Sequence, residues 1–117
     1  MTDLDRTIHE PARLRILTLL SGVDVVDFSF LLSTLGLTKG NLSSHMDKLE
    51  KAGFVEVEKS FNGRIPHTEF RITAAGRDAL HEYWQGIDAI RAMRDLPEKD
   101  AAPDGETEGK RSSKNAG

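Results

Sequence analysis

Residues 35–53 carry the side chains best suited to chemistry. Within this stretch Leu42, Met46 and Leu49 recur at the spacing of one buried stripe on a helix. The residues opposite the stripe are Gly40, Ser44, Asp47 and Lys51, with Asn41 and Lys48 on one flank. Amide and hydroxyl groups can hydrogen-bond to base edges, and lysine can neutralise a phosphate. This face therefore suits a helix that reads DNA, and it equally suits a solvated amphipathic helix.

The ends of this helix are marked by capping residues. Thr38 is a good N-cap, and Gly53 stands where a left-handed residue would follow the last turn. Gly36 breaks the helical pattern that precedes it, so only a three-residue turn separates two amphipathic helices. A polar helix after such a turn is the arrangement that enters a DNA major groove.

The segments before this helix supply elements that would hold it in place. The apolar spacing predicts one helix over residues 11–20 and a second over residues 28–35. We expect Arg13 and Arg15 to point outward from the first of these helices. Residues 23–26 are long enough only for a linker or one short strand.

After Gly53 the apolar period changes from 3.6 to 2, as Val55 and Val57 alternate with glutamates. Asn62-Gly63 then separates two extended segments, which predicts a hairpin with a type I′ turn at these two residues. Because Pro66 cannot donate to a strand ladder, we expect the hairpin tip to project beyond the paired region.

Thr73 is placed to cap a final helix over residues 74–93, which carries an apolar stripe at heptad spacing. One small domain is expected to cover only the start of this stripe, which predicts a homodimer; the alternative is a helix fully docked on its own core. The predicted interface residues are Leu4, Ile8, Leu80, Tyr83, Trp84, Ile87 and Ile90.

Composition limits the classes of function. The chain of 117 residues has no cysteine, which excludes disulfides and thiolate metal sites. Its four histidines lack the spacing of a metal site, so we expect no metal and no cofactor. Because the sequence has no Gly-rich phosphate loop and no nucleophile elbow, we expect that the protein is not an enzyme. An acidic N-terminus and the lack of a long apolar run predict a cytoplasmic protein with no membrane partner.

Charge argues that a single copy would bind nucleic acid weakly. The net charge is −3, and residues 39–71 hold six lysines and arginines against five acidic residues. Two copies on one site would gather more phosphate contacts. Residues 94–117 are polar and lack apolar periodicity, which predicts a disordered charged tail.

Three stretches together resemble the small winged helix-turn-helix transcriptional regulators related to the MarR and ArsR groups. They are IHEPARLRIL, LTKGNLSSHMDKLEKAGFVEVEK and FNGRIPHTEFRITAAGRDAL. The resemblance implies an α+β, mainly helical fold over residues 1–93, with a two-stranded wing and a dimerisation helix at 74–93. It also implies a homodimeric DNA-binding regulator. MarR-type proteins have longer flanking helices that frame a ligand pocket, and in this shorter chain the sequence does not indicate whether any small-molecule effector binds.

The resemblance further implies which residues meet DNA. The exposed part of the recognition helix would present Lys39, Gly40, Asn41, Ser43, Ser44, His45 and Lys48. Of these, Asn41 and Ser44 suit base edges, whereas Lys39, Ser43 and His45 suit phosphates. Arg64, beside the hairpin turn, would enter a minor groove, or else belongs to a solvated tip.

The function expected from these features is sequence-specific regulation of transcription by a repressor that reads a near-palindromic operator. The rival interpretation is a winged helix that binds another protein and no DNA. The near-neutral charge of residues 39–71 favours the rival. The lack of large apolar anchors on the polar face of the helix favours DNA.

Overall fold

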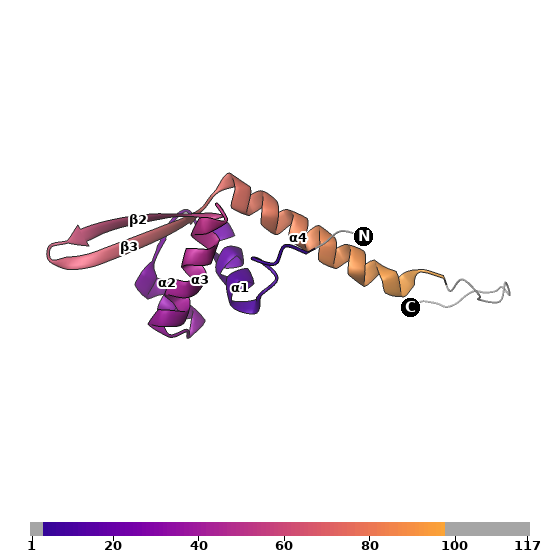
Figure 1. The fold of residues 1–117 in the computed structure, drawn as a ribbon, viewed down its shortest axis with the longest axis horizontal. Coiled ribbons are helices and arrows are strands. Elements are labelled where there is room, and N and C mark those ends of the chain that lie inside the picture. The colour runs from indigo at the N-terminus through magenta and orange to yellow at the C-terminus, as the bar shows by residue number, and fades with distance from the viewer. Residues whose placement is uncertain (1–3, 98–117) are drawn as a thin grey trace.

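The computed structural model describes residues 4–97 and contains helices on one side of a small sheet (Figure 1). The elements are α1 (Pro11–Ser21), β1 (Val26–Asp27), α2 (Phe28–Leu35), α3 (Lys39–Lys51), β2 (Val55–Asn62), β3 (Ile65–Ile72), α4 (Ala74–Ala92) and the 3-10 turn η1 (Met93–Asp95). This order confirms the predicted winged helix-turn-helix fold, and the segment before α2 does form one short strand.

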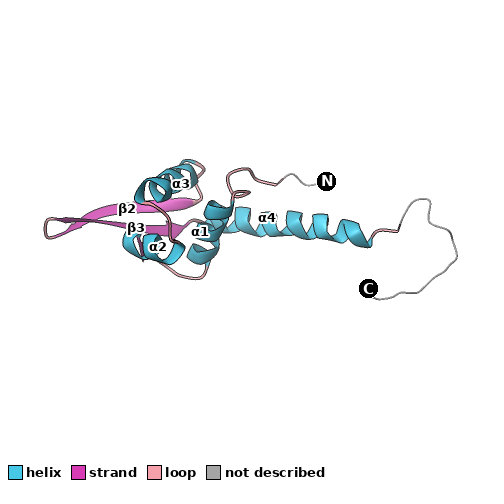
Figure 2. Cartoon of the chain, turned by 90° about the horizontal axis from the view of Figure 1, so that it is seen from below, coloured by secondary structure: helices cyan, strands magenta, loops and turns pink. Residues whose placement is uncertain are grey.

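The three short helices lie against the base of the sheet (Figure 2). They share one hydrophobic core with it. The buried apolar residues are Ile8, Ile16, Leu17, Leu20, Val26, Leu31, Leu42, Met46, Leu49, Val55, Phe70, Ile72, Leu80 and Tyr83. The predicted stripe of α3 lies entirely within this set. Its burial turns the polar face of α3 away from the core.

The sheet has the strand order β1-β3-β2, and all of its pairs are antiparallel. Val55 pairs with Ile72 at the base, where both side chains are buried. The β2–β3 hairpin then extends away from the helices on one side of the domain, and α4 extends on the other (Figure 1). The hairpin is therefore the wing, and most of its length is exposed.

The hairpin turn differs from the prediction in two respects. Asn62 pairs with Ile65, so the two turn residues are Gly63 and Arg64 rather than Asn62 and Gly63. Gly63 has φ 68°, which is the positive φ required at the first central position of a two-residue hairpin turn. The strands are also paired up to the turn, and the expected unpaired tip was wrong. Pro66 lies opposite Phe61, next to the closing pair, where an antiparallel ladder needs no N–H from it.

α4 begins at a well-built cap and leaves the domain. The Thr73 hydroxyl accepts a hydrogen bond from the N–H of Gly76 and donates one to the carbonyl of Gly53, at 2.9 and 2.6 Å. The helix continues past the core into η1 (Figure 1). The predicted disordered tail covered residues 94–117, but Arg94 and Asp95 belong to η1, so the prediction was wrong for its first two residues. Residues 98–117 lie outside the described residues. Within residues 4–97 no helix is long and apolar enough to cross a membrane.

The close approach of α4 to the loop before β2 depends on Gly76. A Cβ there would lie 2.2 Å from the carbonyl oxygen of Phe54 and 2.9 Å from Cγ1 of Ile72. We expect Gly76→Ala to lower the free energy of unfolding by about 2 to 3 kcal/mol, because the backbone must shift. Urea denaturation followed by circular dichroism measures this. Gly40→Ala is the matched control, since in the described chain no atom beyond its neighbours and the nearby backbone of α3 lies within 4 Å of its added Cβ. Equal stability of the two variants would contradict the close packing.

Candidate nucleic-acid interface

α3 is held between two capped ends, as expected. Gly36 ends α2 in the left-handed conformation with φ 68°, and the hydroxyl of Thr38 accepts a hydrogen bond from the N–H of Asn41 at 3.1 Å. At the other end Gly53 has φ 83° and begins the turn into β2. The connection between α2 and α3 consists of Gly36, Leu37 and Thr38. The short connection leaves α3 little freedom to rotate about its own axis.

The outward face of α3 presents most of the predicted contact residues to solvent. Its exposed members are Lys39, Gly40, Asn41, Ser43, Ser44 and Lys48. Among the described residues, the side chains of this set make no hydrogen bond or ion pair. The polar groups of the face are thus free to bind a ligand, which is the arrangement needed for contacts to base edges and phosphates.

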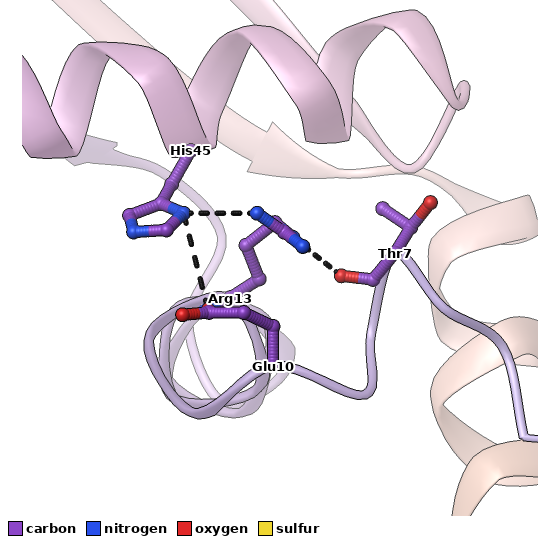
Figure 3. A network of polar contacts seen from close by, with 4 residues as sticks. All are labelled: Thr7, Glu10, Arg13 and His45. Atoms are coloured by element: carbon purple, nitrogen blue, oxygen red, sulfur yellow. Dashed lines mark hydrogen bonds and ion pairs between the residues drawn. The ribbon is translucent and has the colours of Figure 1, made fainter.

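His45 lies differently from the rest of that set, because it points toward α1 (Figure 3). Its side chain is 18% exposed, and its Nδ1 lies 3.1 Å from Nη1 of Arg13 and 3.9 Å from Oε1 of Glu10. Nε of Arg13 also donates to the carbonyl of Thr7 at 2.6 Å. The contact ties α3 to α1 and to the N-terminal segment, so this ring is less available to a phosphate than the exposed residues are.

Glu10 is the acidic member of this network and also the N-cap of α1. Its Oε1 accepts a hydrogen bond from the N–H of Arg13 at 2.8 Å. Partial burial by itself would raise the pKa of Glu10, but this bond and the nearby charges of His45 and Arg13 outweigh burial and lower the pKa. The carboxylate thus stays ionised and stabilises the first turn of α1.

The expected outward orientation of Arg13 and Arg15 was wrong for Arg13. Its guanidinium bridges to Thr7 and His45, whereas Nη2 of the exposed Arg15 donates to the carbonyl of Leu35 at 3.2 Å. The role of Arg13 could not be predicted from the sequence because His45 is 32 residues away. The only sequence signal is local, since Arg13 follows the acidic cap Glu10 by three residues.

The tip of the wing combines the predicted arginine with apolar side chains. Arg64 is exposed in the turn, and its neighbours Phe61 and Ile65 are 73% and 69% exposed. Phe61 and Ile65 were not predicted as contact residues, although Phe61 continues the alternation of Val55 and Val57 beyond the reach of the core. The tip therefore offers both a cation and bare apolar surface to a partner.

Several predicted dimer residues are buried within one chain. Ile8, Leu80 and Tyr83 belong to the core, and Tyr83 Oη lies 3.0 Å from Nδ1 of His9. Leu4 packs so closely on α4 that a Cβ on Gly86 would lie 2.7 Å from its Cδ2. These contacts do not need a second chain to explain them. Trp84, Ile87 and Ile90 are the members of the predicted set that remain partly or largely exposed.

A metal site is absent from the described part of the chain. No group of three or more histidine, aspartate, glutamate or cysteine side chains among residues 4–97 is arranged to hold an ion. The polar groups that could bind a ligand on the outward face of α3 are therefore hydrogen-bonding and cationic side chains, and not metal ligands.

Residues 12–90 match the family described as winged helix DNA-binding domain. The chain belongs to this family. An uncharacterised protein of Methanocaldococcus jannaschii is 46% identical over 79 residues, which are 67% of this chain and 85% of that protein.

Solved structures of transcriptional regulators share the fold. A transcriptional regulator homologue from Pyrococcus horikoshii has a TM-score of 0.71 and 32% identity, over 79% of this chain and 91% of the other. The MarR crystal structure has a TM-score of 0.63 and 17% identity, over 78% of this chain and 67% of its own. At this identity MarR shows the shared fold, which confirms the MarR-like architecture. A relation to the ArsR group stays a prediction.

Because the pKa of Glu10 is lowered, we expect the free energy of unfolding to depend on pH. A carboxyl whose pKa is lowered from 4.5 on folding stabilises the fold above that pH, and this contribution disappears as the pH falls through the folded value. Glu10→Gln should lower the free energy of unfolding by about 1 kcal/mol at pH 7. The deficit should shrink below pH 4.5, the usual value from which the pKa is lowered.

Urea denaturation at several pH values checks this. Glu82→Gln, which removes an exposed carboxylate of α4, is the control. A deficit for Glu10→Gln that stays constant down to low pH would rule out a role for its ionised form.

Proposed function

We propose that this chain is a sequence-specific transcriptional regulator that reads an operator with α3 in the DNA major groove. The observation that carries the proposal is the outward face of α3. It is exposed, its polar side chains are uncommitted among the described residues, and it follows a tight turn within a winged helix DNA-binding domain. The similarity to the transcriptional regulator homologue from Pyrococcus horikoshii supports the regulatory part of the proposal.

Two kinds of contact divide the face of α3. Asn41 can pair bidentately with adenine, and Ser44 can donate to or accept from several bases, so these two read sequence. Lys39, Ser43 and Lys48 bind backbone phosphates and fix the register of the protein on the duplex. Gly40 has open space around it, which lets the backbone of the first turn approach DNA closely.

The wing supplies the remaining contact to DNA. Arg64 lies at the tip, and a narrow A·T-rich minor groove attracts an arginine there. Farther down the wing Glu58 stands directly opposite Glu69. This acidic pair would be repelled by a DNA backbone, so the contact is confined to the tip.

The working form is a homodimer that pairs through the part of α4 beyond the core. Trp84, Ile90, Met93 and Leu96 are exposed large apolar residues at that end, and Trp84 and Ile90 are 41% and 42% exposed. A twofold axis there presents two copies of α3 to half-sites about one DNA turn apart, on a near-palindromic operator. A dimer bound beside a promoter blocks polymerase, so the regulator acts as a repressor.

A winged helix that binds a protein is the second candidate. It is favoured by the apolar wing tip, where Phe61 and Ile65 are the most exposed large apolar side chains of the described chain. Such anchors suit a protein partner. The candidates differ in whether loss of the polar groups on α3 affects binding to DNA.

The reading of bases by Asn41 can be tested by substitution. Asn41→Ala should weaken binding to the operator by about 1 to 3 kcal/mol and leave binding to random DNA nearly unchanged. Fluorescence anisotropy against the DNA upstream of the gene and a scrambled duplex measures both. Lys39→Ala is the matched comparison, because loss of a phosphate contact should weaken binding to both duplexes and lower the salt dependence by about one unit. An equal loss on both duplexes for Asn41→Ala would exclude base reading.

The dimer can be tested on the exposed end of α4. Ile90→Asp should weaken self-association by at least about 1.4 kcal/mol, or tenfold, because a charge would be buried between the helices. Gln85→Asp adds the same charge on the opposite side of α4 and serves as the control. Sedimentation velocity over a concentration series measures the dissociation constant. If both variants dimerise like the parent protein, the interface lies elsewhere.

A further inference from the structure

A basic hollow of about 440 Å³ lies beside the C-terminal half of α3. Its lining residues are Arg6, Thr7, Arg13, Lys48, Lys51 and Ala52. They come from the N-terminal segment, the first turn of α1 and the last turns of α3 and its cap. Four of the six carry a positive charge, and no carboxylate lines the hollow.

The opposite flank of α3 has the reverse charge, which makes the basic hollow a local feature. The cavity between α3 and the sheet is lined by Asp47 and Glu50 from α3, with Lys59 as its only cation. On the helix, Lys48 and Ala52 share one flank, Glu50 lies on the other, and Asp47 and Lys51 lie between them. The net charge of −3 therefore hides a separation of charge across α3.

The cations of the hollow have no close ion-pair partner within the described chain, and the Glu10 carboxylate interacts with Arg13 only at longer range. None of its four cations lies within 4.0 Å of a carboxylate oxygen among residues 4–97, whereas Arg71, Arg91 and Arg94 each have such a partner. Unpaired cations that converge on one concave surface repel one another. An anion bound among them would remove that repulsion.

Within the hollow, the guanidinium of Arg13 is held in position by contacts with the chain itself. Nε donates to the carbonyl of Thr7 and Nη1 contacts Nδ1 of His45, at 2.6 and 3.1 Å (Figure 3). Both partners hold the guanidinium in place, and neither carries a negative charge that would cancel its charge. An arginine has five N–H donors, so donors remain for another ligand. A fixed guanidinium with free donors is suited to the tetrahedral oxygens of a phosphate.

We propose that this basic hollow is a phosphate-binding site, with Arg13 as its fixed donor and Arg6, Lys48 and Lys51 as surrounding cations. The phosphate belongs either to the DNA backbone or to a small phosphorylated molecule. In the first case the site rests on the proposed function, and it clamps the backbone on the side of α3 away from the wing. In either case the bound phosphate joins α3 to the N-terminal segment, since both contribute cations.

A titration without DNA tests the site itself. The probe is inorganic pyrophosphate at constant ionic strength, followed by NMR of the arginine Nε–H groups. Lys51→Gln and Arg6→Gln should each weaken binding roughly tenfold, the effect of losing one hydrogen bond to a charged group. Both residues are exposed, so these variants are expected to fold. Arg91→Gln removes a charge of the same sign on α4 and should leave the affinity unchanged.

The salt dependence of operator binding identifies the source of the phosphate. If the DNA backbone occupies the hollow, Lys51→Gln and Arg6→Gln should each lower the slope of log K against log salt by about 0.9, and Arg91→Gln should not. Weaker pyrophosphate binding with an unchanged slope supports a small phosphorylated ligand instead. If the parent protein binds no DNA, the proposed function fails and the titration alone decides on the hollow. If Lys51→Gln and Arg6→Gln show the same pyrophosphate affinity and the same salt slope as Arg91→Gln, the proposal of a phosphate site is wrong.

Discussion

Burial of Leu42, Met46 and Leu49 is the interaction on which the rest of the surface depends. These side chains are held in the shared core, and full burial of each stabilises the fold by about 1.5 to 3 kcal/mol. A helix with one face committed in this way must turn its other face to solvent. The caps at Thr38 and Gly53 set the length of that face. The position of Asn41 and Ser44 on the molecule is thus a consequence of packing on the opposite side of α3.

Polar contacts also determine how α3 is positioned in the fold. The contacts of Arg13 with Thr7 and His45 join α1, α3 and the N-terminal segment at one point (Figure 3). Hydrophobic burial is not directional and tolerates some sliding, whereas hydrogen bonds from a planar guanidinium specify direction. The network can therefore define how α3 is set relative to α1 while the core supplies most of the stability.

The distribution of charge matters more than its sum. The net charge is −3, yet the flank of α3 that meets the N-terminal segment is basic, and the middle of the wing is acidic. Interactions with a phosphate backbone fall off over about 10 Å at 0.1 M salt, so distant glutamates weaken a local basic surface only slightly. A chain with a net negative charge can therefore carry local surfaces that suit a phosphate backbone.

Periodicity and capping act within a few residues of the chain, so the helices and strands, the ends of α3 and the residues on its polar face could be predicted from the sequence. Which groups on that face are free depends on tertiary packing. His45 is bound to Arg13 across 32 residues, and Tyr83 meets His9 across 74, so neither contact leaves a local pattern. The same reason explains why Ile8 and Tyr83, predicted at a dimer interface, are core residues. An apolar stripe reports that a surface will be buried, and only the packed chain shows what buries it.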